Sequence, residues 1–191
     1  MILEKQSLSA QDQRILRALD RAAGDLRRGE AVFVFDGSSG VAAGTDSARP
    51  PGDTPGLLIF SLDHADADTL GLVQQQGSTP GQLLLTGPRA QALGLASDKG
   101  AGIAVTLPPS ASLDWAMFLA IASWDERERL SLSHRGLDAA GSAALRLAKL
   151  APCLPALLAR EVTLDAADGL LPGVLPVRAQ DTDRFHHLQA L

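Results

Sequence analysis

Few side chains in this sequence are of the types that catalyse reactions or bind metals. The chain has four histidines, His64, His134, His186 and His187, and one cysteine, Cys153. Imidazole, thiolate and carboxylate groups bind metals or transfer protons when several of them converge on one point. The histidines are scattered along the chain. The sequence therefore predicts no metal site and no catalytic residue.

Two histidines have acidic neighbours, and each pair has two interpretations. His64 lies between Asp63 and Asp66 where a strand meets a helix, so the acids either bind a metal or cap the helix. Asp183 and His187 share one face of a terminal helix, which is typical of a solvated or packed surface. Capping and packing are favoured in both cases. We expect no metal and no other cofactor.

A polar region near the middle of the chain could bind an anion. It comprises SWDERER and SLSHRG, with the candidate side chains Arg127, Arg129, His134 and Arg135. A solvated helix face is the favoured interpretation, because Asp125 and Arg129 stand four residues apart and can pair.

Two other features have common structural explanations. DGSSG, residues 36–40, is the segment nearest to a phosphate-binding loop, but Asp-Gly and Ser-Gly are common in hairpin turns. The P-loop, dinucleotide-binding and nucleophile-elbow motifs are all absent from the sequence. Cys153 lies between two prolines and among leucines, without a polar activator nearby in sequence. It is predicted to be a buried packing thiol.

The elements that would position these residues alternate between apolar runs and helical patterns. A helix is expected over 9–28, with Ser9 as its N-cap, and a surface loop over 46–56. Strands are expected over 31–37, 56–62, 81–87, 103–108, 156–162 and 173–179, with a return strand over 41–44 and an acidic turn between the last two strands. Further helices are expected over 66–76, 88–94, 113–122, 137–150 and 182–191.

This order predicts an α/β (α+β) fold with helices packed around a mixed sheet, as one domain over residues 1–191. Helix 113–122 is apolar all round and is expected to be buried on most sides. The terminal helix carries Phe185 and Leu188 on one face. This pattern indicates that the helix docks on another surface or leads into a further part of a protein.

Composition limits the partners and the compartment. The chain has 191 residues, 46% of them hydrophobic, and 22 acids against 17 bases give a net charge of −5. Scattered basic residues and the acidic balance argue against nucleic acid, and no apolar run is long enough to span a membrane. A single cysteine permits no internal disulfide. We expect a cytoplasmic protein of bacterial origin, the latter because Ala, Leu, Gly and Arg are abundant.

Four segments, in order, resemble 3,4-dihydroxy-2-butanone 4-phosphate synthase. RAAGDLRRGEAVFVFDG (21–37) resembles its opening helix and first strand, and 62–95 its next helix, strand and short helix. GLDAAGSAALRLAKLAPCLPALLAREV (136–162) is similar to its late GHTEA segment and the strand that follows. LPVRAQDTDRF (175–185) is similar to its last strand and helix. The resemblance covers nearly the whole chain.

The resemblance fails where that family binds magnesium and its substrate. The family's acidic loop corresponds to DGSSGVAAGTD, which keeps Asp36 and Gly44 but has Gly40, Val41 and Ala43 in place of an arginine and two glutamates. In the GHTEA segment the histidine is Leu137, and the glutamate is Ala140, within one position. The phosphate-binding loop falls on hydrophobic residues 114–122. Magnesium needs oxygen ligands that these side chains cannot supply.

The pattern resembles the degenerate synthase-like N-terminal domain of some bacterial GTP cyclohydrolase II proteins. It implies a pseudoenzyme, a homodimer with a structural or regulatory role in riboflavin-type biosynthesis, associated with a cyclohydrolase II domain in cis or in trans. One alternative is a module that binds a small ligand, a sugar phosphate or a nucleotide. Another is an enzyme rebuilt around Asp36 and the region from Arg127 to Arg135.

Overall fold

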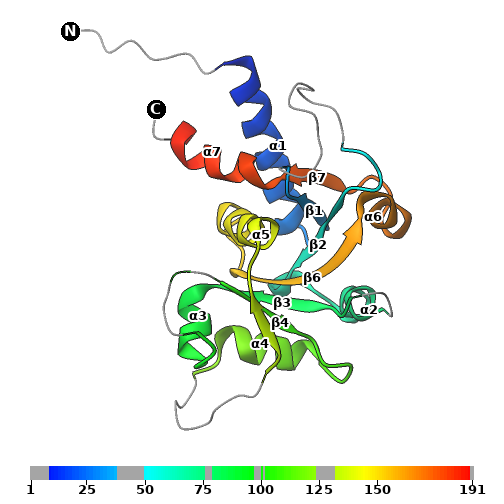
Figure 1. Cartoon of the computed structure of the whole chain (residues 1–191), viewed down its shortest axis with the longest axis vertical. Coiled ribbons are helices and arrows are strands. Elements are labelled where there is room, and N and C mark those ends of the chain that lie inside the picture. The colour runs from blue at the N-terminus through cyan, green and yellow to red at the C-terminus, as the bar shows by residue number, and fades with distance from the viewer. Residues whose placement is uncertain are drawn as a thin grey trace, which may run out of the picture.

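A seven-stranded mixed sheet forms the centre of the protein, in the order β5-β4-β3-β6-β2-β1-β7 (Figure 1). The computed structural model describes residues 9–37, 50–75, 79–96, 100, 102–123 and 132–189, with side chains to residue 185. The strands are β1 (Val32–Phe35), β2 (Pro55–Ser61), β3 (Gln82–Leu85), β4 (Ile103–Thr106), β5 (His134–Gly136), β6 (Ala156–Thr163) and β7 (Leu175–Arg178). Neighbouring strands are antiparallel except β1 and β7, which are parallel.

Helices cover both faces of this sheet. They are α1 (Ala10–Arg27), the short 3-10 helix η1 (Leu62–His64), α2 (Ala67–Gln74), α3 (Gly87–Ala92), α4 (Leu113–Ile121), α5 (Ala139–Leu150), α6 (Leu164–Leu170) and α7 (Ala179–Gln189). Helices α1, α5 and α7 pack on one face, and α2, α3, α4 and α6 on the other. Strands buried on both faces are continuously apolar, which is why the sequence shows unbroken hydrophobic runs.

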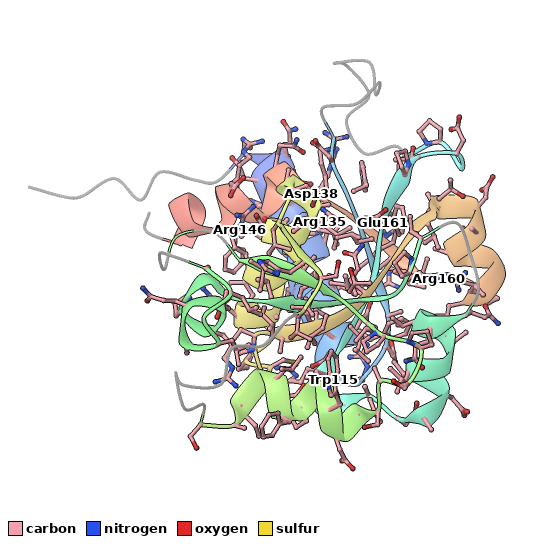
Figure 2. The ribbon with its side chains drawn as sticks, turned by 60° about the horizontal axis from the view of Figure 1, so that its bottom comes forward. Trp115, Arg135, Asp138, Arg146, Arg160 and Glu161 are labelled. Atoms are coloured by element: carbon pink, nitrogen blue, oxygen red, sulfur yellow. The ribbon has the colours of Figure 1, made fainter. Side chains whose placement is uncertain are left out.

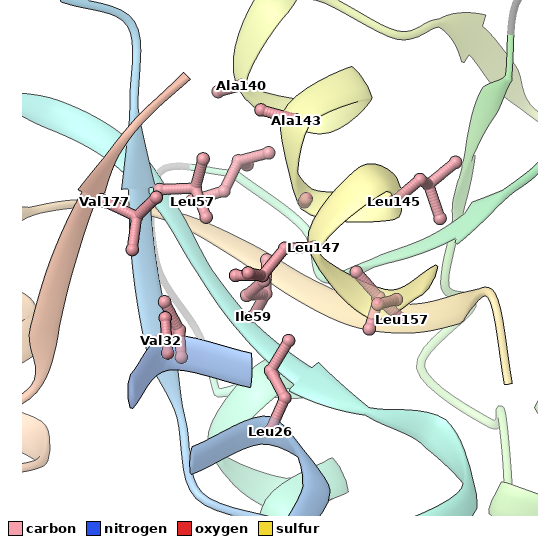
Figure 3. Close-up of a cluster of buried hydrophobic side chains, with 14 of the residues drawn as sticks. Leu26, Val32, Leu57, Ile59, Ala140, Ala143, Leu145, Leu147, Leu157 and Val177 are labelled. Carbon is pink, nitrogen blue, oxygen red and sulfur yellow. The ribbon is translucent and has the colours of Figure 1, made fainter. Parts of the chain in front are cut away.

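Alternate strand residues divide the core into two clusters. Val32, Ile59 and Leu157 point to the face covered by α1 and α5, where Figure 3 shows them around Leu147. Phe33, Phe60 and Leu158 point to the other face. Since successive side chains of a strand alternate between faces, each apolar run supplies both cores. The α/β class and the mixed sheet predicted from the sequence are confirmed.

Helix α5 packs on the sheet through a side built largely from small residues. Ala143, Ala144 and Ala148 are fully buried against the first core, and α5 contacts α1, α7 and four strands. Arg146 of α5 binds α7, donating from Nε to the Thr182 hydroxyl at 3.1 Å and pairing with Asp183 at 3.0 Å. The alanine-rich sequence of α5 therefore allows α5 and α7 to pack as one layer on this face of the sheet.

The capping residues expected from the sequence are largely those observed. The Ser9 hydroxyl accepts a hydrogen bond from the Asp12 N–H at 3.1 Å, and α1 ends before Gly29, whose φ is +79°. Asp66 caps α2 by accepting from the Thr69 N–H at 2.8 Å. These contacts satisfy backbone groups that a helix end leaves unpaired.

Several predicted elements were wrong in type or extent. The acidic turn between the last two strands is helix α6, which buries Leu164 and Ala167, and β6 and β7 are not neighbours. A strand, β5, occupies residues for which no element was predicted, and its three residues are all exposed, so no apolar pattern marks it. β2 begins at Pro55, inside the expected loop 46–56.

Helix boundaries also shifted. Helix α5 starts at Ala139 because Asp138 caps it, its carboxylate accepting from the Gly141 N–H at 2.8 Å. Helix α7 starts at Ala179, three residues before the predicted start. The predicted return strand over 41–44, residues 46–49 of the predicted loop and residues 38–40 of DGSSG lie outside the described residues.

Helix α4 is not buried on most sides, contrary to prediction. Only Ala116 and Leu119 are buried within it, whereas Phe118 is 48% exposed and Ile121 is 60% exposed. Trp115 is partly buried against the second core (Figure 2). In the part of the chain that the structure describes, no helix is long and apolar enough to cross a membrane.

Replacing Ala144 by leucine should destabilise the fold, because three extra carbons cannot enter a fully buried position on the closely packed face of α5. We expect a loss of about 1–3 kcal/mol in the free energy of unfolding. The matched control, Lys149→Leu, adds leucine on the exposed side of the same helix and should stay within about 0.5 kcal/mol of the parent. Urea unfolding measures both, and equal losses would contradict the packing described.

Candidate functional site

A cavity of about 550 Å³ opens at one end of the central strands, on the face of the sheet that α5 covers. It lies where β2 begins, where β6 ends and where α5 starts. Its lining residues are Asp36, Pro55, Gly56, Leu57, Thr79, Arg135, Asp138, Ala140, Glu161, Val162 and Thr163. The polar side chains among them come from separate strands and a helix cap, so the fold and not a local motif brings them together.

Strand register explains how Arg135 reaches Glu161. Arg135 lies on the edge strand β5 and pairs with Ala104 of β4, whose small side chain leaves room above the sheet. Gln82 begins β3 and pairs with Ala159, two residues before Glu161 on β6. Figure 2 shows Arg135, Asp138 and Glu161 next to one another near the start of α5.

The guanidinium of Arg135 is the centre of a closed polar network. Its Nη2 donates to Glu161 Oε1 at 2.5 Å and to Gln82 Oε1 at 3.3 Å. Gln82 Nε2 donates to the same glutamate oxygen at 2.9 Å, and Arg135 Nη1 lies 3.8 Å from Asp138 Oδ2. Arg135 thus lines the cavity as an ion pair with Glu161, with its donors directed at protein acceptors.

The described residues do not fit the magnesium that the resemblance implies. Leu137 and Ala140, at positions where the family has a metal-binding histidine and a glutamate, offer no ligand atom. Asp138 caps α5, and Asp36 accepts from Gln180 Nε2 at 2.9 Å. Glu161 is paired with Arg135. Among the described residues, the carboxylates of this cavity are not part of any cluster close enough to share one ion.

Of the candidate anion-binding side chains, the structure describes only His134 and Arg135. Arg135 does line the cavity, but it is bound to carboxylates. His134 is exposed, with Nδ1 2.8 Å from the Leu132 carbonyl oxygen. Arg127 and Arg129, like the loop positions Gly40, Val41, Ala43 and Gly44, lie outside the described residues. Reasoning from the sequence did not identify Gln82 and Glu161 as members of the site. A charged residue inside the apolar run ALLAREV was the signal that could have pointed to Glu161.

The residues around His64 were only partly interpreted correctly. Asp66 is a helix cap as expected, but Asp63 caps no helix: its Oδ2 accepts from the Leu154 N–H at 3.1 Å. Cys153 is buried as predicted, yet it lies against Asp63 and His64, with one ligand atom of each within 4.8 Å of the others. The side chain of His187 lies outside the described residues, whereas Asp183 pairs with Arg146.

Comparison with known proteins agrees with the resemblance seen in the sequence. No family model matches the chain. A GTP cyclohydrolase-2 of Azospirillum brasilense is 32% identical over 158 residues, which are 80% of this chain and 37% of that protein. The chain thus spans little more than a third of that relative.

Solved structures show the same fold. The 3,4-dihydroxy-2-butanone 4-phosphate synthase of Candida albicans superposes with a TM-score of 0.60 at 16% identity, over 87% of this chain and 96% of that one. A synthase of the same name in complex with two magnesium ions gives a TM-score of 0.56 at 15% identity, over 90% and 96%. The chain has the fold of these synthases and shares sequence with a GTP cyclohydrolase-2, as its segment order predicted.

The Arg135–Glu161 pair should contribute only modestly to stability, because its side chains are 44% and 37% exposed and water screens the charges. A double-mutant cycle with Arg135→Gln and Glu161→Gln should give a coupling of about 1 kcal/mol or less in urea unfolding. Added salt should reduce the coupling. A coupling well above 2 kcal/mol would show instead that the pair is shielded from solvent.

Proposed function

We propose that this chain is a synthase-like domain that lacks synthase chemistry and has a structural or regulatory role beside a GTP cyclohydrolase II in riboflavin-type biosynthesis. The observation that carries the proposal is that the Arg135 guanidinium is hydrogen-bonded to Glu161 in the lining of the cavity. The sequence shared with a GTP cyclohydrolase-2 supports the choice of partner.

The ionisable groups that line the cavity argue against synthase chemistry. General acid–base catalysis needs a group that can exchange a proton near the working pH, held within reach of the substrate. Among the described lining residues the ionisable groups are three carboxylates and one guanidinium, and the guanidinium does not give up its proton. Leucine and alanine stand at the positions where the family binds its metal. The three carboxylates accept hydrogen bonds from Gln180, the Gly141 N–H and Arg135, which argues against their acting as free bases.

The charge of the cavity also bears on the alternative, a module that binds a sugar phosphate or a nucleotide. Asp36, Asp138 and Glu161 outnumber the single Arg135 among the described lining residues. Two of these carboxylates already lie beside the guanidinium. An anionic phosphate would therefore meet a net negative field. We rank this alternative second for that reason.

A two-fold dimer is the assembly we propose for the chain. The exposed large side chains Phe118 and Ile121 of α4 are apolar and would be covered by a second copy. A self-complementary two-fold contact is the commonest way in which a soluble protein buries such residues.

The purified chain should not convert ribulose 5-phosphate to the four-carbon ketone phosphate when magnesium is present. Millimolar magnesium should also leave the melting temperature unchanged, because a ligand stabilises a protein only by binding its folded state. An active synthase assayed in parallel is the positive control. Turnover above the blank that a chelator abolishes, or a magnesium-dependent rise of several degrees, would contradict the proposal.

A GTP cyclohydrolase II should respond to this chain. We expect the two proteins to co-elute on size exclusion, and the rate of GTP turnover to change when the chain is added in excess. Light scattering on the same column should give a dimer mass for the chain alone. An unrelated acidic protein of similar size, added at the same concentration, serves as the control for non-specific effects. Separate elution with an unchanged rate would leave the small-ligand module as the better hypothesis.

A further inference from the structure

A second cluster of chemically active side chains lies at the opposite ends of β2 and β6 from the cavity. Asp63 and His64 come from η1, directly after β2, and Cys153 lies just before β6. One ligand atom from each of the three lies within 4.8 Å of the other two. β2 has seven residues and so separates this cluster from the cavity by about 20 Å.

The cluster is held in place from several sides. The Ser61 hydroxyl donates to Asp63 Oδ1, and the Leu154 N–H donates to Oδ2 at 3.1 Å, which joins η1 to the turn before β6. His64 Nδ1 lies 3.1 Å from Asp63 Oδ1. Gly29, at the end of α1, approaches so closely that a Cβ built on it would lie 3.2 Å from the His64 Cβ.

The arrangement of the three groups suits a cation. A sulfur, an imidazole nitrogen and a carboxylate oxygen lie within 4.8 Å of one another. The Ser61 hydroxyl and the Leu154 N–H hold the carboxylate of Asp63 in place beside the buried thiol. A thiol that binds a metal ion gives up its proton as it does so.

We propose that Asp63, His64 and Cys153 form a binding site for a divalent cation of borderline softness, best matched by zinc. Sulfur, imidazole nitrogen and carboxylate oxygen together are zinc ligands, whereas magnesium and calcium prefer oxygen alone. With bonds of about 2.0–2.3 Å, a tetrahedral ion holds its ligand atoms roughly 3.5 Å apart, so the cluster must contract by about 1 Å. The His64 side chain is 41% exposed and can rotate to allow this. The fourth position is left for water.

The site is independent of the proposed function and acts on a different part of the fold. An ion here would join the segment after β2 to the segment before β6, residues that are about ninety positions apart in the sequence. Because both segments continue into the central strand pair, binding should stabilise the folded chain.

Zinc and cobalt titrations of the chelator-treated protein test this site. We expect one zinc ion per chain, a higher melting temperature with zinc, and a cobalt complex with the absorption of a thiolate-bound tetrahedral ion. Cys153→Ser should abolish the thiolate band, and His64→Ala should weaken zinc binding at least tenfold. The exposed His134, near the cavity at the other end of the sheet, supplies the matched control His134→Ala, which should bind as the parent does.

Circular dichroism first checks that each variant is folded. If the buried Cys153→Ser variant fails to fold, the surface variant His64→Ala decides the question, together with the cobalt spectrum of the parent. Three results would overturn the site: no zinc bound at micromolar protein, a cobalt spectrum without thiolate character, or zinc binding as tight in His64→Ala as in the parent. Binding that is lost instead in His186→Ala or His187→Ala would likewise assign the ion to the terminal helix.

Discussion

The antiparallel pairing of β2 with β6 is the interaction on which the rest of the structure depends. The two strands pair from Pro55 opposite Thr163 to Ser61 opposite Leu157, and their central side chains are buried on both faces of the sheet. A shift of the register by one residue would move every side chain to the other face. It would turn Glu161 away from Arg135 and put aliphatic side chains in the space that the alanines of α5 require. One register therefore sets both cores and the place of the cavity.

Much of the fold could be predicted because its signals are local. Runs such as AVFVF and GLLIFSL are apolar enough to be strands in any context, and Ser9 marks a helix start by its own side chain. The order of the strands is not local: β6 lies between β2 and β3 although it is almost last in the chain. Burial is not a local property either. The all-round apolar pattern of α4 predicted a buried helix, but the fold covers only one side of it.

The candidate sites were harder to predict because each depends on contacts between distant residues. Arg135 was a candidate anion ligand, but its partner Glu161 is 26 positions away and was not considered. Cys153 was set aside because no polar residue is near it in sequence, whereas the fold brings it to His64. The short strand β5, which carries Arg135, contains no apolar residue from which a strand could be predicted. Composition and periodicity describe single elements and contain no information about such pairs.

The two ends of the β2–β6 pair carry different kinds of charge. At the cavity the positive group is a guanidinium paired with carboxylates, which offers a metal ion no ligand. At the other end the proposed ligands are a carboxylate, an imidazole and a thiol, which together suit zinc. Zinc should therefore act on the cluster around Cys153 and leave the cavity network unchanged. An ion bound there would join η1, which follows β2, to the segment between α5 and β6, at the end of the strand pair opposite the cavity.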